Sequence, residues 1–507
     1  MKEKLRLHLQ EKAYFLILLP CFFILHGYNL FFGFFTFLNI IINFLGTALL
    51  ACLVYFITYF IAREKIRRSI LAFWITAFIL FFRSLHDFLK ELDHFVILGK
   101  YTIILPSFML AMLLLALYLK RVSEGRRLFL FLNYLLLAFL LFESSISIYK
   151  LFQKENKLLK IKADKEAIKA NGLISDSLKP DIYFIVFDGM PNKRSMIKIN
   201  SAYNTNFYAN LQKKNFKIQS SSLSNYDRTV FSLSSTFNMA YIDSSDAVYS
   251  HLQYLKALES IKKNRLTEFL KQQNYKVFQI QPLSNNNQDW QGQTLFSKLL
   301  SEHFFYETLF GCMYRDLNFH LNKFNFFKRK NTNSQIESIN QKNKDLLLTI
   351  SKTKLTSSYS QTPKFVYAHL MIPHEPYVYD SNGNILVNVE KNPLTKENEL
   401  SKFYEQALYA EKVALDLIDH LLSKNKKNTV IMIEGDHGFR SLYGNSNHLT
   451  HENLNAIYIP NLVHDNIYPA MSPVNTFRYV LNSYFDTRLP FLIDSSIFIP
   501  YSAPETK

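Results

Sequence analysis

The sequence predicts an N-terminal bundle of about five transmembrane helices, followed by an α/β domain with a mostly parallel central sheet. Two observations lead to this fold class. Residues 13–62 contain no Lys, Arg, Asp or Glu, and beyond residue 181 short apolar runs alternate with stretches in which every third or fourth residue is apolar. The 507 residues are 49% hydrophobic, which excludes an intrinsically disordered chain. We expect a transmembrane domain over residues 1–149, a connector over 150–180 and a folded domain over 181–507.

Five apolar runs account for the transmembrane domain. About 20 residues cross the hydrocarbon core as a helix, so residues 13–62 hold two helices, with the break expected near Gly27-Tyr28-Asn29. Three further runs cover residues 69–82, 101–119 and 128–148. The run 69–82 is short. If it does not cross, the count becomes four and the folded domain lies on the other side of the membrane.

Basic residues give the chain a net charge of +17, from 58 Lys and Arg against 41 Asp and Glu. They gather at the N-terminus, over residues 63–68 and over 120–127, at alternate ends of the apolar runs. Cytoplasmic loops carry the excess of Lys and Arg, so five crossings place residues 181–507 outside the cytoplasm. The connector over 150–180 is rich in Lys, which is typical of a solvated helix near anionic head groups. The sequence carries no nucleic-acid-binding signature.

Four short runs rich in apolar, β-branched or aromatic residues are predicted as buried strands. They cover residues 182–187, 364–370, 429–433 and 456–459, and helical patterns between them cover 207–213, 265–273 and 400–422. Strands that alternate with helices form a mostly parallel sheet with helices on both faces. Such sheets bind ligands beyond the carboxyl ends of their strands, so the polar residues at those ends are the site candidates.

Two strand ends carry side chains that suit a divalent cation. The first strand runs into Asp188-Gly189, where glycine permits a tight turn and the carboxylate faces the crevice; an ordinary Asp-Gly turn is the alternative. The strand 429–433 runs into Glu434-Gly435-Asp436-His437-Gly438. The adjacent Asp and His offer one oxygen and one imidazole ligand on a backbone that bends easily. This pattern predicts a metal or catalytic centre.

Hydroxyl and histidine side chains supply candidates for a nucleophile and a proton donor. Several Ser and Thr residues, among them Thr229 and Ser232, lie near a predicted helix start. Such hydroxyls cap helices, and one of them is also suited to attack a phosphoryl group held by main-chain N–H groups. His374 lies in a loop between two prolines, where it can protonate a leaving group. Two further histidines are possible substrate-binding residues: His448 and His451.

Taken in order along the chain, these motifs resemble the sulfatase-like branch of the alkaline phosphatase superfamily, and the apolar helices before them resemble its membrane-anchored members, the lipoteichoic acid synthases and phosphoethanolamine transferases. The resemblance implies an alkaline-phosphatase-like sandwich that holds one divalent metal ion, Mn, Mg or Zn. The implied metal ligands are Asp188, Thr229, Asp436 and His437. Thr229 ends an Asn-Tyr-x-x-Thr pattern and is implied as the nucleophile in preference to Ser232. His374 is implied as the substrate-binding or proton-donating residue.

Three features depart from these relatives. No Cys/Ser-x-Pro-x-Arg motif surrounds Thr229, so a formylglycine sulfatase is not expected. The first ligand is Asp188, where the transferases generally have Glu, which leaves the donor lipid open. Two-metal relatives add an Asp-x-x-x-His pair, and Asp416 and His420 have this spacing. They lie within the helical pattern over 400–422 and are interpreted as part of a helix face.

Together these inferences predict a multi-pass enzyme of the bacterial inner (cytoplasmic) membrane, with its catalytic domain on the periplasmic or extracellular side. It is expected to transfer or hydrolyse phosphoester head groups of the phosphoglycerol or phosphoethanolamine type, for modification of envelope lipid or polysaccharide. The implied partners are a phospholipid-like donor, a lipid-linked or polysaccharide acceptor and the membrane. Two alternatives stay open: a phosphodiesterase or phosphatase of the same superfamily, and a non-catalytic membrane lipid-binding protein.

Overall fold

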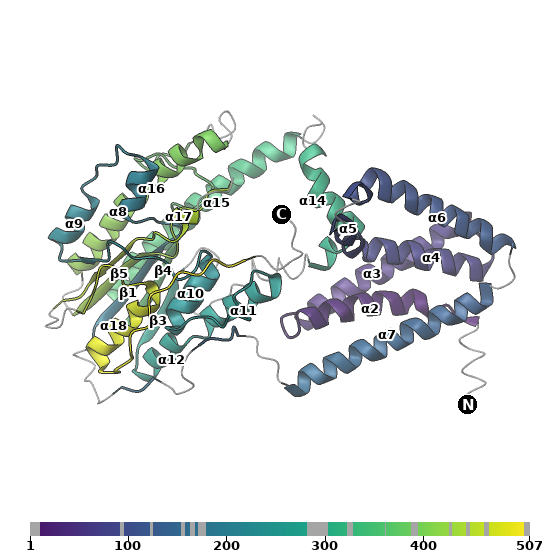
Figure 1. Cartoon of the computed structure of the whole chain (residues 1–507), viewed down its shortest axis with the longest axis horizontal. Helices are drawn as coiled ribbons and strands as arrows, with labels where there is room; N and C mark the ends of the chain where they lie inside the picture. Colours follow the sequence, from purple (N-terminus) through teal and green to yellow (C-terminus); the bar gives the residue numbers. More distant parts are fainter. Residues whose placement is uncertain are drawn as a thin grey trace. The chain divides into compact units, whose positions relative to one another are not determined.

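The computed structural model divides into two compact units (Figure 1). The first combines the described parts of residues 1–156 and 293–329, and the second combines those of 157–292 and 330–502. The described residues 303–321, which the sequence analysis placed in the catalytic domain, therefore group with the N-terminal helices. The structure describes residues 11–91, 96–121, 125–153, 158–162, 168–170, 179–280, 303–321, 328–359, 361–386, 394–424, 428–442, 447–460 and 466–500.

Apolar helices make up the first unit. They are α2 (Phe15–Leu30), α3 (Phe37–Ile57), α4 (Lys65–Leu80), α5 (Phe82–Glu91), α6 (Tyr101–Arg121), α7 (Gly125–Gln153) and α14 (Leu309–Leu321), with 3-10 turns at Thr58–Phe60 and Val96–Gly99. Within the described residues, three helices are long and apolar enough to cross a membrane, namely Phe37–Phe60, α6 and α7. The pair α4 and α5, bent by 61°, counts as a fourth if it forms one span, and α2 is apolar but shorter. Each predicted run forms a helix, and the chain is a membrane protein.

The first turn of the chain lies later than predicted. The break expected near Gly27 falls beyond Leu30, where Gly33 adopts a φ of +80°. Gly27 lies inside α2, and a Cβ atom there would lie 2.5 Å from the ring of Phe304. The break lies one residue beyond the predicted Gly27-Tyr28-Asn29 stretch, and Gly27 itself serves close packing and not the turn.

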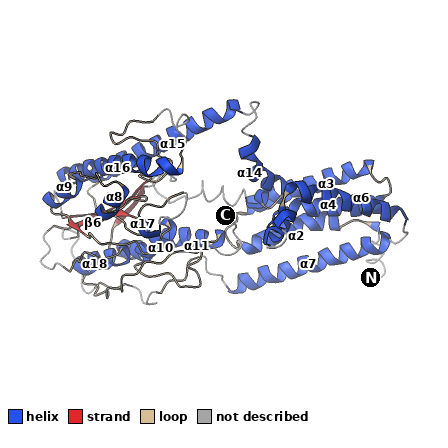
Figure 2. Cartoon of the chain, turned by 45° about the horizontal axis from the view of Figure 1, so that its top comes forward, coloured by secondary structure: helices blue, strands red, loops and turns tan. Residues whose placement is uncertain are grey.

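The second unit contains a sheet of six described strands with helices on both faces (Figure 2). The strands are β1 (Asp181–Phe187), β2 (Lys217–Ile218), β3 (Lys276–Ile280), β4 (Lys364–Leu370), β5 (Thr429–Gly435) and β6 (Asn455–Tyr458). Their order is β2-β6-β5-β1-β4-β3. β3, β4, β1 and β5 are parallel to one another. β6 is antiparallel to β5, and β2 is antiparallel to β6. The predicted fold class, a mostly parallel sheet behind apolar helices, is confirmed.

Alternation along the central strand explains the two helical layers, since successive side chains of β1 point to opposite faces. Tyr183, Ile185 and Phe187 pack into one core, and their even-numbered neighbours pack into the other. The first core is covered by α8 (Lys193–Ile199), α9 (Phe207–Lys213), α15 (Lys328–Leu355) and α16 (Lys396–Lys424). The second is covered by α10 (Thr229–Asn238), α11 (His251–Lys262), α12 (Arg265–Gln272) and α18 (Pro473–Phe485). The remaining short helices are Thr356–Ser358 and α17 (Asn447–Thr450).

Within the stretch predicted as a basic helical connector, the described residues are helical up to Gln153 and not beyond it. α7 ends at Gln153, and the described residues 158–162 contain no helix. Leu159 is buried in a core of the second unit, and Ile161 forms a β-bridge with Ile242. The apolar Leu159 is recruited by that core, which a solvated helix would not allow.

Candidate metal centre

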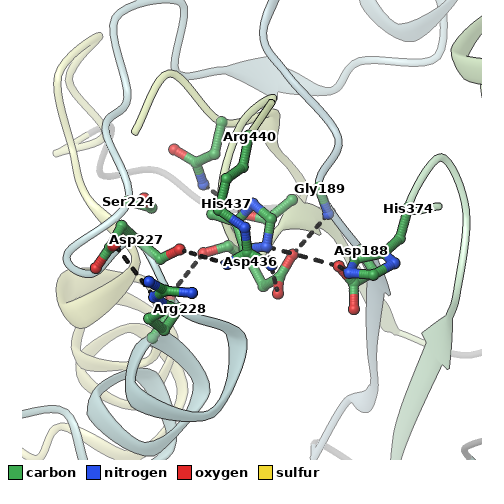
Figure 3. Close-up of polar contacts among 12 residues, drawn as sticks. Asp188, Gly189, Ser224, Asp227, Arg228, His374, Asp436, His437 and Arg440 are labelled. Carbon is green, nitrogen blue, oxygen red and sulfur yellow. Dashed lines mark hydrogen bonds and ion pairs between the residues drawn. The ribbon is translucent and has the colours of Figure 1, made fainter. Parts of the chain in front are cut away.

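The carboxyl ends of three adjacent strands bring four side chains together. Asp188 follows β1, His369 lies near the end of β4, and Asp436 and His437 follow β5. β1 pairs in parallel with both β4 and β5, so these ends meet at one edge of the sheet. All four side chains are buried. Figure 3 shows Asp188, Asp436 and His437 close together, with His374 beside Asp188.

Distances within this group suit a shared cation. His437 Nε2 lies 3.6 Å from Asp188 Oδ1 and 3.7 Å from Asp436 Oδ2. His369 Nε2 lies 3.3 Å from Asp188 Oδ2, and the ligand atoms of Asp188, His369 and Asp436 fall within 4.8 Å of one another. Two ligand atoms that are each about 2.1 Å from one zinc ion lie roughly 3–4 Å apart.

Glycine holds the two acidic strand ends against each other. Gly189 has a φ of +72°, and its N–H donates a hydrogen bond of 2.9 Å to Asp436 Oδ1. A Cβ atom on Gly435 would lie 2.1 Å from the carbonyl oxygen of Met190. Larger residues would separate the strand ends, so the Asp-Gly pair serves the site as well as the turn.

Three buried acceptor atoms face one another without a donor between them. His437 Nδ1 lies 2.7 Å from the carbonyl oxygen of Gly438. A carbonyl only accepts, so Nδ1 carries a proton, and the neutral tautomer that this contact selects presents the lone pair of Nε2 to the site. Among the described residues, Asp188 Oδ1, Asp436 Oδ2 and His437 Nε2 have no hydrogen-bond partner. Burial of unpaired acceptors is costly. One divalent cation would satisfy all three, and the residues therefore fit such an ion.

The electrostatics of Asp188 agree with this arrangement. Burial raises the pKa of Asp188, but His374, His369 and His437 around it together hold that pKa well below its usual range. Burial lowers the pKa of His369, but its close contact with Asp188 and the negative charge of that carboxylate outweigh burial and raise the pKa above its ordinary value. The carboxylate is therefore ionised across the neutral pH range and available as a ligand.

His369 is a site residue that sequence reasoning missed. Its Nδ1 lies 2.9 Å from the hydroxyl of Tyr367, and its Nε2, turned toward Asp188, has no hydrogen-bond partner. The sequence analysis included His369 in the predicted strand 364–370. It named only His374, in the following loop, as a site histidine of this segment, with a substrate-binding or proton-donating role. A histidine one residue before the end of a buried parallel strand was the available signal.

His374 lies in the loop after β4 and also faces Asp188. Its backbone N–H donates to the carbonyl oxygen of Asp188 at 3.0 Å, and its Nε2 lies 4.0 Å from Asp188 Oδ1. Its Nδ1 lies 2.8 Å from the carbonyl oxygen of Glu375. That acceptor assigns the proton to Nδ1 and turns Nε2 toward the site.

Two side chains from α15 and α16 hold this loop. The buried Gln406 donates from Nε2 to the carbonyl oxygens of Pro373 and His374, both at 2.9 Å. Lys342 Nζ donates to the carbonyl oxygens of His374, at 2.5 Å, and Pro376, at 2.9 Å. Burial lowers the pKa of Lys342 to about 7, although the nearby Asp188 and Glu375 carboxylates act in the opposite direction.

The predicted nucleophile segment lies next to the Asp-His pair. Thr229 is the first residue of α10 and is partly exposed. Ser232, one turn later, is buried and donates its hydroxyl to the main-chain oxygen of Asp436 at 2.6 Å. This bond ties the first turn of α10 to the strand end that carries Asp436 and His437.

Of the two histidines predicted as possible substrate-binding residues, the structure describes the side chain of one. His451 Nδ1 lies 3.0 Å from the carbonyl oxygen of Ser224 and 3.2 Å from its hydroxyl, so it contacts the loop that leads to Thr229. Burial lowers the pKa of His451, which favours its neutral form. The side chain of His448 lies outside the described residues.

The Asp-x-x-x-His pair of α16 is separate from this group. Asp416 forms an ion pair of 2.6 Å with Lys354, and His420 Nε2 lies 3.3 Å from the hydroxyl of Ser357. Both partners belong to the end of α15 and the 3-10 turn after it. Within the described residues, the group around Asp188 is the one set of side chains placed to hold a metal ion.

Comparison with known proteins agrees with the motifs. The family model described as Sulfatase matches residues 180–471, more than half of the chain. No curated protein matches the sequence. Solved structures that are similar include the C-terminal periplasmic domain of EcEptC from Escherichia coli in complex with Zn, at 14% identity and a TM-score of 0.40, over 66% of this chain and 94% of that one.

Two further structures extend the comparison. The integral membrane protein lipooligosaccharide phosphoethanolamine transferase A from Neisseria meningitidis aligns at 12% identity and a TM-score of 0.36, over 85% of this chain and 95% of that one. A putative sulfatase from Bacteroides thetaiotaomicron aligns at 11% identity and a TM-score of 0.36, over 64% of this chain and 73% of that one. The matched family region contains every strand of the sheet, including the ends that carry Asp188, Asp436 and His437. The chain belongs to the sulfatase family.

Proposed function

We propose that this protein is a metal-dependent transferase or hydrolase of phosphoester head groups, of the phosphoglycerol or phosphoethanolamine type, with Thr229 as its nucleophile. The observation that carries the proposal is the set of three buried, unpartnered acceptor atoms on Asp188, Asp436 and His437. They lie beside the first turn of α10, to which Thr229 belongs.

A divalent ion, Mn, Mg or Zn, would be held by Asp188, Asp436 and His437 together with Thr229, and His369 is a further ligand candidate. When bound, it supplies positive charge that neutralises phosphoryl oxygens and favours the deprotonated form of a hydroxyl ligand. The donor set of two carboxylates and imidazole nitrogen suits all three metals.

Thr229 is favoured over Ser232 by its surroundings. The Ser232 hydroxyl is buried and already donates to Asp436 O, whereas Thr229 is partly exposed at the helix N-terminus. Main-chain N–H groups at a helix N-terminus attract phosphoryl oxygens. Attack by Thr229 Oγ1 forms a new O–P bond and breaks the bond to the leaving alcohol, which leaves the head group on the threonine as a phosphodiester.

His374 is the proposed proton donor. Its Nε2 faces the site, and its loop is held by Gln406 and Lys342. In the protonated state, Nε2 would give its proton to the departing alkoxide oxygen, and the neutral imidazole would then take a proton from the attacking acceptor hydroxyl or water. Possible substrate contacts of His448 and His451 belong to the same proposal.

The apolar helices support a lipid-borne substrate. Basic clusters over 63–68 and 120–127 lie at the same end of the helices, at the start of α4 and at the junction of α6 and α7. The positive-inside rule assigns this end to the cytoplasm, and α7 then leads the chain to the periplasmic or extracellular side of a bacterial inner membrane. There a phospholipid-like donor and a lipid-linked or polysaccharide acceptor are within reach.

The test is turnover of a phospholipid with a fluorescent head group, and of bis-p-nitrophenyl phosphate, by the purified protein with and without EDTA. We expect metal-dependent turnover that is lost in Thr229→Ala, retained in part in Thr229→Ser, and accompanied by a labelled Thr229 peptide in mass spectrometry. Release of the head group to an added acceptor indicates transfer, and release to water alone indicates hydrolysis. No turnover and no bound metal would refute the proposal and leave a lipid-binding protein.

A further inference from the structure

A segment far from the N-terminus in sequence is built into the apolar unit. The described residues 303–321 follow the strands β1 to β3 in the chain, yet they group with the N-terminal helices. They contain a turn of helix at residues 303–306 and then α14, which packs against α4 and α5. We call residues 303–316 the inserted segment.

One face of the inserted segment is fixed by close packing. The ring of Phe304, which is 2% exposed, stacks on Phe35 at 4.9 Å and contacts Phe23 at 5.8 Å between ring centroids. Gly27 leaves the room that this ring occupies. Further along, Cys312 is fully buried in a cluster with Phe82 and Ile104. The segment is therefore an integral part of the apolar unit.

Polar contacts hold the segment where the apolar helices begin and end. Nη1 of Arg83, at the start of α5, lies 3.3 Å from Glu307 Oε1. The backbone N–H of Arg83 donates to the carbonyl oxygen of Glu307 at 3.1 Å. Tyr101, the first residue of α6, donates its hydroxyl to Asp316 Oδ2 at 2.8 Å. Carboxylates and a guanidinium are costly in the hydrocarbon core but not in the head-group layer. These contacts place the segment at the level of the lipid head groups.

The opposite face of the segment presents aromatic rings to the outside. Phe310 is 50% exposed, and Tyr314, one helical turn later, is exposed beside it. Phe305 is also exposed, with its ring centroid 6.2 Å from that of Tyr314. The neighbouring helix α5 and the 3-10 turn Val96–Gly99 expose Phe88 and Ile97. Aromatic rings above a polar anchor are typical of the interfacial belt of membrane proteins.

We propose that the inserted segment is an interfacial membrane-docking element, with Phe305, Phe310 and Tyr314 in the head-group and upper acyl-chain layer of the bilayer. The occupant of this face is phospholipid, because the face continues the exposed apolar surface of the membrane-crossing helices. The described parts of the chain alternate between the two units, with residues 303–321 returning to the first unit after β3, whereas a simple anchor would precede the second unit once. The proposal concerns membrane contact and holds whether or not the chain turns over phosphoesters.

Tryptophan fluorescence in the full-length protein tests the proposal. The chain contains two Trp, and Trp74→Phe with Trp290→Phe provides a silent background. Phe310→Trp and Tyr314→Trp report on the segment and keep an aromatic ring at each position. Phe498→Trp is the matched control, because Phe498 is 52% exposed in the second unit, and Phe142→Trp, on the exposed surface of α7, is the lipid reference. Each variant is reconstituted in nanodiscs of phosphatidylethanolamine and phosphatidylglycerol, with or without bromine on the upper acyl chain.

We expect brominated lipid to reduce the emission of Trp at positions 310 and 314 about twofold or more, with a blue-shifted maximum, as at position 142. Position 498 should be unaffected by bromine and quenched by aqueous acrylamide. Positions 310 and 314 quenched by acrylamide and not by bromine would overturn the proposal. Protection from both quenchers would overturn it too, because a protein surface would then cover this face. Unchanged melting temperatures of the variants show that each retains the fold.

Discussion

The two ends of the same parallel strands both bury charge, but in opposite ways. At the amino ends of β1 and β4, Asp181 and Lys364 form a buried ion pair of 2.7 Å. The backbone N–H of Lys364 also donates to Asp181 at 3.2 Å, and its ammonium donates to Tyr359 O at 2.7 Å. At the carboxyl ends, Asp188 and Asp436 face imidazole nitrogens with acceptor atoms that no described group satisfies.

Burial of charge therefore does not identify a functional site in this sheet. Asp181 and Lys364 require no further ligand, because each charge faces an opposite charge and has hydrogen bonds. The carboxyl end contains two carboxylates within reach of His437, and the printed ion pairs of Asp188 and Asp436 among the described residues are with histidines, not with Lys or Arg. The end that lacks an internal partner is the end that requires a ligand, and four predictions follow from this contrast.

Asp436→Asn should give the largest effect. The amide keeps an oxygen for the Gly189 N–H and removes one negative charge from the site, so metal binding fails and turnover falls about a thousandfold. The melting temperature of the metal-free protein should stay equal or rise, because the repulsion with Asp188 is relieved. Turnover of the phosphodiester and thermal melting in EDTA measure the two effects. A large loss of stability in the metal-free variant would contradict this prediction, because Asp436 would then stabilise the fold as Asp181 does.

Lys364→Met, at the amino ends of the strands, should lower stability and leave turnover unchanged. An unpaired buried Asp181 costs about 3–5 kcal/mol of unfolding free energy, while turnover per folded molecule should stay unchanged. The double variant Asp181→Asn with Lys364→Met is the matched control and should recover most of the stability. Denaturant unfolding measures the free energy, and a loss of turnover by folded protein would contradict the contrast between the two ends.

His369→Gln tests whether the strand histidine belongs to the metal site. We expect metal affinity to fall about 10–100-fold, the range seen when a supporting group of a metal site is removed. Titration with a chelating indicator measures this affinity, and His420→Gln on α16 is the control. Equal affinities of the two variants would assign His369 to packing alone.

Lys342→Met should give the smallest effect, visible as a change in pH dependence. Burial lowers the pKa of Lys342 to about 7 in the folded chain, against 10.5 when exposed. Between these values the unfolded chain binds more protons, so the free energy of unfolding rises with pH, by at most about 1.4 kcal/mol per pH unit, and this dependence vanishes below pH 7. Melting from pH 6 to 10 should show this slope in the parent protein and a smaller one in the variant. Lys344→Met, at an exposed position of α15, should keep the parent slope.

Much of the fold was predictable because its signals are local. Long uncharged apolar runs identified α2, α3, α4, α6 and α7 of the membrane unit, and short apolar runs identified β1, β4 and β5 close to their observed bounds. β3 was missed because its short run mixes polar and apolar residues, and it gains its place by pairing with β4. The role of Gly27 was not predictable, because a glycine suits both a turn and a close contact, and only the position of Phe304 distinguishes the two uses.

Within the candidate site, the sequence alone nominated Asp188 and the Asp436-His437 pair as candidates, because polar residues beside glycine at the ends of buried strands have few structural uses. The tertiary structure decided which atoms remain without partners, that His369 joins them, and that His451 contacts the Ser224 loop. It also placed residues 303–316 in the membrane unit. Residue type and local period are properties of neighbours along the chain, whereas an unpaired acceptor or a filled gap depends on segments far apart in sequence.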